Sequence, residues 1–161
     1  MKLLTSSKLV LPKNYQKDEK IIIRALRCLE ERMRYPIDRL NNSQDVKAYL
    51  RLHLAGEINE VFAVLFLNNQ KCLIAFEILF HGTINQAAVY PRVILQKALA
   101  YNAAAIVLAH NHPSGECMPS NADIEITKTL EKVLEIVDIT VLDHVIVSQR
   151  DSYSLAEHRM I

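Results

Sequence analysis

The feature that most constrains the fold is an unbroken apolar stretch over residues 104–110, AAIVLAH. A strand of this composition is typical of a position where both faces of a sheet are covered, because neither face carries polar side chains before the last residue. Helical patterns over residues 91–102 and 120–137 flank the stretch and can supply that cover. The sequence therefore predicts an α/β domain with a mixed sheet.

Further strands are expected on both sides of this segment. VFAVLFL (61–67) and CLIAFEILF (72–80) are rich in β-forming residues, and the polar residues 68–71 between them predict a hairpin. A short extended piece is expected around residues 87–90. ITVLDHVIV (139–147) indicates another buried strand, and DSYSLA (151–156) one more short strand.

The N-terminal part has a different character. Residues 1–13 predict an irregular arm, and residues 15–34 an amphipathic helix with Ile22, Leu26, Leu29 and Met33 along one stripe. A second helix is expected over residues 43–54. We divide the chain into an arm and helix over 1–40 and a main domain over 41–161. The extension is either a support packed on that domain or an arm that docks a partner.

Composition narrows the functional classes. The 161 residues carry a net charge of +1, so the overall charge does not indicate a nucleic-acid-binding protein. No apolar run reaches the length of a membrane span, and the first residues do not resemble a secretory signal. The three cysteines, Cys28, Cys72 and Cys117, form neither a disulfide framework nor a Cys-x-x-Cys site. We therefore expect a cytoplasmic protein.

The chemistry is concentrated in AHNHPSGECMPSNAD, residues 109–123. His110 and His112 are two positions apart at the end of the buried strand, so their imidazoles point to the same side. Ser120 and Asp123 follow at the start of the next helix. Two histidines and one carboxylate leave one tetrahedral position open, which is the arrangement of a catalytic zinc site.

Each part also has a structural interpretation. Ser120 and Asp123 have the spacing of a capping box, in which both merely satisfy backbone groups at a helix N-terminus. A histidine at a strand end is commonly only hydrogen-bonded. Neither interpretation accounts for the histidine pair together with the carboxylate, and a cap and a metal site can coexist.

The spacing His-x-His, seven residues, Ser, two residues, Asp resembles the JAMM (MPN+) metalloprotease motif, and within it the RadC-like branch. The resemblance extends over about residues 58–161. It is carried by Gly82-Thr83, Tyr90-Pro91-Arg92, residues 102–105 (NAAA), residues 110–115 (HNHPSG), residues 119–123 (PSNAD) and residues 141–144 (VLDH). It implies the three-layer, cytidine deaminase-like α/β fold of MPN domains. The deaminases' own His-x-Glu and Pro-Cys-x-x-Cys signature is absent.

The resemblance also implies a glutamate from an upstream strand as general base. The candidate is Glu77, which period 2 places on one face of its strand with Leu79, while Phe76, Ile78 and Phe80 lie on the other. Burial would raise the pKa of such a carboxyl toward that of a general base. The alternative is an edge-strand glutamate that reaches solvent. The Ser120 hydroxyl is expected to stabilise the oxyanion.

The implied function is a zinc metallopeptidase with one zinc per chain, held by His110, His112 and Asp123, and a peptide or protein substrate. Cobalt or manganese also suit these ligands. The alternatives are a DNA-repair-associated protein or an MPN scaffold without hydrolase activity. The glycine-rich helix-hairpin-helix region of longer RadC-like proteins is absent from these residues, which weakens the DNA alternative.

Several residues keep two interpretations. Asp143 and His144 form either a partner that orients a ligand imidazole or a satisfied core pair. His144 could also replace Asp123 as a ligand. Cys117 is either a loop thiol or a group that reaches the open metal position. We expect His53, His81 and His158 to be exposed or hydrogen-bonded, and Arg92 to make a structural contact.

Overall fold

A computed structural model describes residues 15–34, 42–82 and 89–161. Its five-stranded sheet has the order β2-β1-β3-β4-β5. The strands are β1 (Val61–Leu67), β2 (Leu73–His81), β3 (Ala105–Asn111), β4 (Thr140–Val147) and β5 (Ser152–Ser154). Only the central β3–β4 pair is parallel, so the sheet is mixed as predicted.

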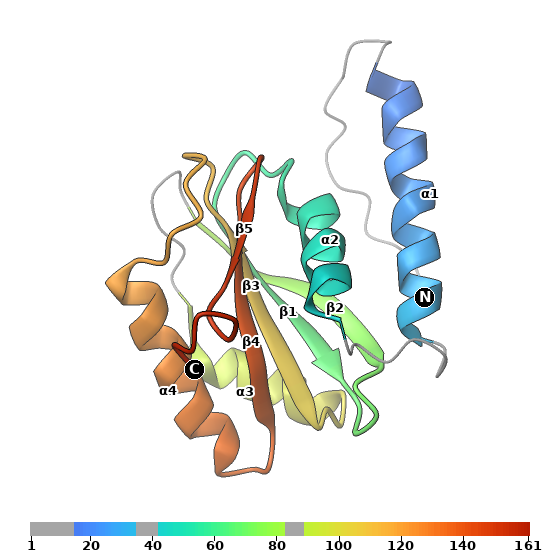
Figure 1. Cartoon of the computed structure of the whole chain (residues 1–161). Helices are drawn as coiled ribbons and strands as arrows, with labels where there is room; N and C mark the ends of the chain where they lie inside the picture. Colours follow the sequence, from blue (N-terminus) through green and yellow to red (C-terminus); the bar gives the residue numbers. More distant parts are fainter. Residues whose placement is uncertain (1–14, 35–41, 83–88) are drawn as a thin grey trace.

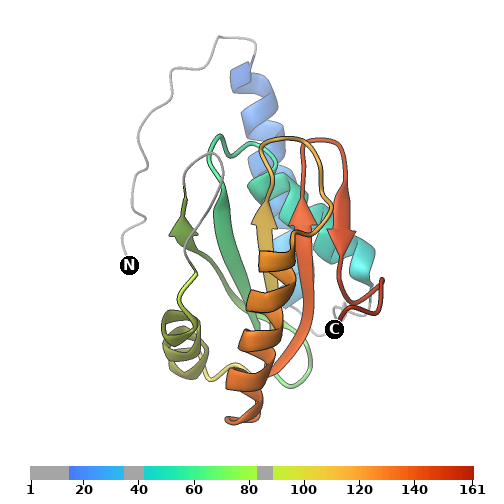
Figure 2. The same cartoon turned by 90° about the vertical axis from the view of Figure 1, so that its left-hand side faces the viewer.

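Helices cover both faces of the sheet (Figures 1 and 2). They are α1 (Tyr15–Arg34), α2 (Ser43–Leu54), α3 (Pro91–Ala100) and α4 (Asn121–Glu135). The α2 side and the α3–α4 side each hold a separate apolar cluster, and β3 contributes alternate residues to both. The three-layer α/β prediction is confirmed, and residues 105–110 of the apolar run are buried between the two helical layers.

The predicted elements agree with the structure to within two residues at each end. Pro91 opens α3 at its first position, and Ser120 is the N-cap of α4. The second helix begins at Ser43 as predicted and is capped by Asn42, whose side chain accepts from the Gln44 N–H. The predicted arm over 1–13, residues 87–88 of the expected extended piece, and Thr83 lie outside the described residues.

The prediction of strict alternation along β2 was wrong near both ends, because the register with β1 shifts at two places and Leu73 lies on the opposite face from Ala75. The partner of Phe62 is Phe80, whereas the partner of Ala63 is Ile78, so a bulge leaves Leu79 without a partner. Because the bulge inserts one residue, Phe80 moves to the face covered by α3 and α4, where its ring lies 6.2 Å from that of Phe62. Glu77 lies on this same face.

The N-terminal helix α1 contacts α2 and β2. Leu29 packs against the cluster on the α2 side, and the Tyr49 hydroxyl donates to Glu30 at 3.4 Å. Ile21 and Ile23 are 66% and 45% exposed. The contacts through Leu29 and Glu30 fit the supporting interpretation of this helix. Within the described ranges, no helix combines the length and apolarity needed to cross a membrane.

Candidate metal centre

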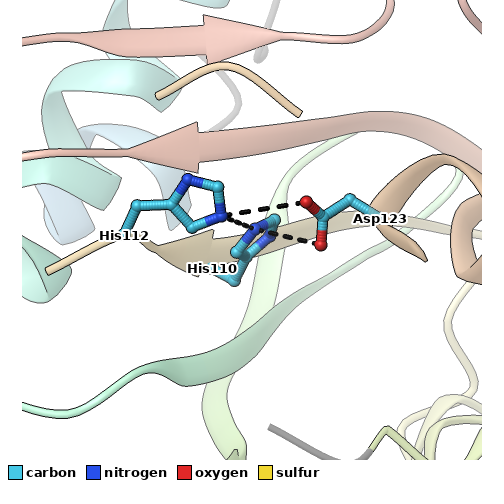
Figure 3. A group of neighbouring side chains, drawn as sticks. All are labelled: His110, His112 and Asp123. Carbon is cyan, nitrogen blue, oxygen red and sulfur yellow. Dashed lines mark hydrogen bonds and ion pairs between the residues drawn. The ribbon is translucent and has the colours of Figure 1, made fainter. Parts of the chain in front are cut away.

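The predicted ligands meet where β3 ends and α4 begins, at the carboxyl ends of the two parallel strands (Figure 3). The Nε2 atoms of His110 and His112 are 2.9 Å apart. Asp123 places Oδ1 3.3 Å from His110 Nε2 and Oδ2 3.8 Å from His112 Nε2. All three candidate ligand atoms lie within 4.8 Å of one another, so the group could hold one metal ion.

The turn after β3 makes this convergence local. The His112 backbone N–H donates to the Val147 carbonyl at 2.8 Å, which anchors the end of β3 to β4. The Gly115 N–H then donates to the His112 carbonyl at 3.1 Å, with Gly115 at φ +96°. Only glycine adopts that conformation without strain, so HPSG can turn the chain away directly after the second histidine.

The capping box and the ligand set exist together. Ser120 Oγ accepts from the Asp123 N–H at 3.2 Å, and Asp123 Oδ2 accepts from the Ser120 N–H at 2.8 Å. The Ser120 hydroxyl also donates to Asp123 Oδ2 at 2.7 Å. The cap therefore orients the carboxylate toward the histidines. In this structure the Ser120 hydroxyl donates its hydrogen bond to Asp123, so its direct contact is with a candidate ligand.

The hydrogen bonds of both imidazoles turn their lone pairs toward the site. His112 Nδ1 lies 2.8 Å from the Glu116 carbonyl, which can only accept, so Nδ1 carries the proton. His110 is held through Nδ1 by His144 at 2.8 Å, which leaves its Nε2 facing Asp123. Imidazole lone pairs and a carboxylate therefore converge. Such a donor set fits a divalent cation, which is stabilised by all three groups.

The Asp123 carboxyl is adapted to carry negative charge. Burial disfavours ionisation, but the Ser120 hydroxyl and backbone N–H donate to the carboxylate and favour its charged form, and the pKa of Asp123 lies well below its ordinary value. Its position in the first turn of α4 adds the favourable field of the helix N-terminus. The third candidate ligand is therefore ionised at neutral pH.

Glu77 does not lie with the other candidates. Its carboxylate accepts from the Tyr101 hydroxyl and pairs with Lys97 Nζ at 2.7 Å, both on the α3 side. In the register Glu77 pairs with Val64, which pairs with Leu108, two residues before His110. That offset corresponds to about 7 Å along the strands and about 10 Å across them.

The expectation of a raised Glu77 pKa was wrong. Burial does act to raise it, but the hydrogen bonds from Lys97 and Tyr101 and the charge of Lys97 lower the pKa below its ordinary value. An ion-paired carboxylate is a weaker base than an isolated one. The assignment of Glu77 as general base therefore has no geometric support.

Asn111, between the two histidines, has a role that the sequence analysis missed. Its side chain is buried and points away from the imidazoles. Asn111 Oδ1 accepts from the Val61 N–H at 2.7 Å, and Nδ2 donates to the carbonyls of Glu57 and Asn59 at 3.3 and 3.1 Å. Asn111 thereby clamps the segment that leads into β1 against the ligand-bearing end of β3.

That segment carries Glu60, a second carboxylate that the sequence analysis missed. Phe62 pairs with His110 in antiparallel register, and extending this register by two residues brings the backbone of Glu60 level with His112. The Glu60 carbonyl also accepts from the Gly82 N–H at 2.8 Å. The alternation of β1 places Glu60 on the same face as Phe62, two residues later. Knowledge of the β1–β3 pairing would therefore have marked Glu60 as a carboxylate near the histidines.

The residues with two interpretations are now located. Asp143 accepts from the N–H groups of His144 and Ala156 and from the Ser154 hydroxyl, so it does not pair with the His144 imidazole. His144 lies behind His110 and is outside the ligand group. Cys117 is also outside it, and burial raises the pKa of its thiol.

The remaining residues were partly predicted. His81 and Arg92 are exposed, and the His158 ring stacks on Tyr153. The expectation for His53 was wrong. Its ring is half-buried beside Tyr49 and Phe76, and its Nε2 has no hydrogen-bond partner among the described residues.

Comparisons with known proteins agree with this geometry. The profile of the RadC-like JAB domain matches residues 40–160. The chain is 49% identical over 144 residues to the UPF0758 protein YkfG of Escherichia coli (strain K12), covering 89% of this chain and 91% of that protein. It is 55% identical over 120 residues to a UPF0758 protein of Cellvibrio japonicus (strain Ueda107), covering 74% of this chain and 54% of that protein.

A UPF0758 protein of Janthinobacterium sp. (strain Marseille) is 46% identical over 147 residues, which are 91% of this chain and 65% of that protein. The chain thus spans nearly all of YkfG but only about half to two thirds of the two other relatives named. The domain match covers most of the chain and includes every candidate ligand. The chain belongs to the family of RadC-like JAB domain proteins.

Proposed function

We propose that this protein is a zinc-dependent metallopeptidase that hydrolyses an amide or isopeptide bond in a peptide or protein substrate. The observation that carries the proposal is the convergence of His110, His112 and Asp123 within 4.8 Å. Three protein ligands leave the fourth tetrahedral position free for water or substrate, as in catalytic rather than structural zinc sites. When bound, zinc supplies Lewis acidity, which acidifies water and polarises a carbonyl.

The chain's own residues divide the remaining work. Asp123 contributes the charged ligand, and Ser120 holds that carboxylate through its hydroxyl and backbone N–H. Within 15 residues the sequence therefore supplies both the ligand set and the contacts that orient its carboxylate. An oxyanion-stabilising role for Ser120 requires its hydroxyl to turn from Asp123 toward substrate.

We assign the general base to Glu60 instead of Glu77. Glu60 immediately precedes β1, at the end of the strand that is nearest to the histidines, and Asn111 holds the backbone next to it. A base must come within hydrogen-bond reach of the proton that it removes, and extending the register brings the backbone of Glu60 level with His112. Glu77 is committed to Lys97 and Tyr101 at a distance from the ligands.

Metal content is the first test. Mass spectrometry on protein purified without chelator should give about one zinc per chain, and His110→Ala and Asp123→Ala should each lose it. Glu77→Ala is the matched control, since it removes a carboxylate on the same sheet face but outside the ligand group. A folded wild-type protein that takes up no zinc when zinc is added would overturn the proposal.

Activity is the second test. Zinc-loaded protein should cleave members of a panel of fluorogenic peptides and isopeptide-linked conjugates, and Glu60→Gln should be inactive with its zinc retained. If zinc binds but no member of the panel is cleaved, the alternative of an MPN scaffold becomes the better account. Retained activity in Glu60→Gln would reject the assignment of the base alone.

A further inference from the structure

A third histidine, His144, lies directly behind the two histidines of the candidate metal centre. His144 is in the middle of β4, has no exposed surface, and places its Nε2 2.8 Å from His110 Nδ1. The Phe62 ring packs against both imidazoles, with ring centroids 6.1 Å from His110 and 5.4 Å from His144. A buried imidazole is costly in such apolar surroundings unless both of its nitrogens are hydrogen-bonded.

The other nitrogen of His144 is bound by a threonine of α4. Thr127 is fully buried, and its Oγ1 lies 2.5 Å from His144 Nδ1. The same hydroxyl donates to the Asp123 backbone carbonyl, one helical turn earlier, at 2.5 Å. A hydroxyl has one proton, so a hydroxyl that donates to Asp123 must accept from His144. His144 therefore carries its proton on Nδ1.

The series of hydrogen bonds from Asp123 through Thr127 and His144 determines which nitrogen of His110 carries the proton. A neutral imidazole carries one proton, and that of His144 is on Nδ1, so its Nε2 is an acceptor. His110 must then donate to it through Nδ1–H, which leaves the lone pair of His110 Nε2 directed at Asp123 Oδ1, 3.3 Å away. This series of hydrogen bonds begins at the Asp123 backbone carbonyl and ends at His110, beside the Asp123 carboxylate.

We propose that Thr127 and His144 are positioning residues that hold His110 in the tautomer required of a metal ligand. The inference rests on the proposed function, because it concerns the ligand set of that site. It adds a physical link between two ligands: the residue that supplies the carboxylate also supplies, through its carbonyl, the acceptor that orients the imidazole. Partners of ligand imidazoles typically affect metal affinity 10- to 100-fold.

A purely structural role would not require this arrangement. Leucine or phenylalanine at position 144 would pack in the same layer without any buried polar atom to satisfy. The neighbouring Asp143 makes its hydrogen bonds with Ser154, Ala156 and the His144 backbone, so it does not explain the imidazole. The contacts of the His144 ring nitrogens are with His110 and Thr127 alone among the described residues.

The test compares two removals with two conservative replacements. His144→Leu and Thr127→Val should each lower zinc affinity about 10- to 100-fold, measured by competition with a chromophoric chelator. Thr127→Ser keeps the hydroxyl and should stay within about threefold of the wild type. His144→Gln keeps an acceptor for His110 Nδ1–H and should bind zinc more tightly than His144→Leu. Circular dichroism spectra establish that each variant is folded.

Nitrogen-15 NMR of the metal-free protein provides a readout that does not depend on metal or activity. His110 should be protonated on Nδ1 alone in the wild type and in Thr127→Ser, and should mix tautomers in His144→Leu. Wild-type zinc affinity in folded His144→Leu and Thr127→Val, or a His110 proton on Nε2 in the wild type, would overturn the inference.

The failure of the proposed function gives a different pattern. If the wild type binds zinc but hydrolyses nothing, the affinity series still decides the role of His144 and Thr127. If the wild type binds no zinc, the metallopeptidase proposal fails, and the inference that His144 serves a metal ligand fails with it. An Nδ1 proton on His110 would then mean that the hydrogen bonds of Thr127 and His144 are structural only.

Discussion

Two carboxylates on the α3–α4 side of the sheet, Glu77 in β2 and Asp123 in α4, have opposite surroundings. Glu77 is paired with Lys97 and receives the Tyr101 hydroxyl, so its charge is balanced inside the protein. Asp123 faces two imidazoles, and no lysine or arginine among the described residues pairs with it. A balanced carboxylate stabilises the fold, whereas a carboxylate among converging lone pairs is suited to a cation from outside. Burial alone does not distinguish a functional acid from a structural one.

The sharpest test of the interpretation that Glu77 is structural compares its substitution with that of Glu60, the proposed general base. Glu60→Gln should lower kcat by about 10²- to 10⁴-fold, the usual contribution of acid–base catalysis, with zinc content unchanged. Glu77→Gln should change kcat by less than about threefold, because the side chain does not reach the site. Steady-state hydrolysis at saturating substrate measures both, and the reverse order of effects would restore Glu77 as the base.

Zinc should stabilise the fold through Asp123. Free zinc at about 1,000 times its dissociation constant contributes about 4 kcal/mol, which corresponds to a rise in Tm of roughly 10 °C for a domain of this size. Differential scanning fluorimetry with and without chelator measures the rise. It should vanish in Asp123→Ala and persist in Glu77→Ala. An equal rise in both variants would mean that zinc binds elsewhere.

Asn111 should affect stability and catalysis without contacting the metal. Asn111→Ala leaves the buried Val61 N–H without its acceptor, so we expect a loss of about 1–3 kcal/mol in the free energy of unfolding. Because the freed segment carries Glu60, kcat should also fall, while zinc content stays at wild-type level. Urea denaturation and steady-state kinetics report the two effects separately, and lost stability with unchanged kcat would separate Asn111 from the base.

The smallest effect is expected from the Glu77–Lys97 pair. The folded-state pKa of Glu77 is lowered, so its contribution is present above the ordinary value of 4.5 and is lost as the pH falls through the folded-state pKa. Lys97 is 42% exposed, and solvent screening limits the pair to about 1 kcal/mol or less. The difference in unfolding free energy between wild type and Lys97→Met at pH 7 should therefore shrink at pH 3. If the difference in unfolding free energy is the same at both pH values, Lys97 contributes through packing and not through its charge.

Much of the fold could be predicted because its signals are local. The apolar run 104–110 required cover on both faces, and the helix bounds followed from periodicity, Pro91 and Ser120. The end of β2 could not be predicted, because the bulge at Leu79 exists only in the pairing with β1. A single inserted residue reverses which face every later side chain occupies.

The same division holds at the candidate site. The sequence by itself determined that His110 and His112 share one side of a strand end and that Ser120 caps the helix bearing Asp123, since strand period and capping geometry act within a few residues. Only the tertiary structure showed that Glu77 is held by Lys97 and Tyr101, and only it gave His144 its partners. Those contacts join β2 to α3 and β4 to β3 and α4, whose register and packing depend on residues far apart in the chain.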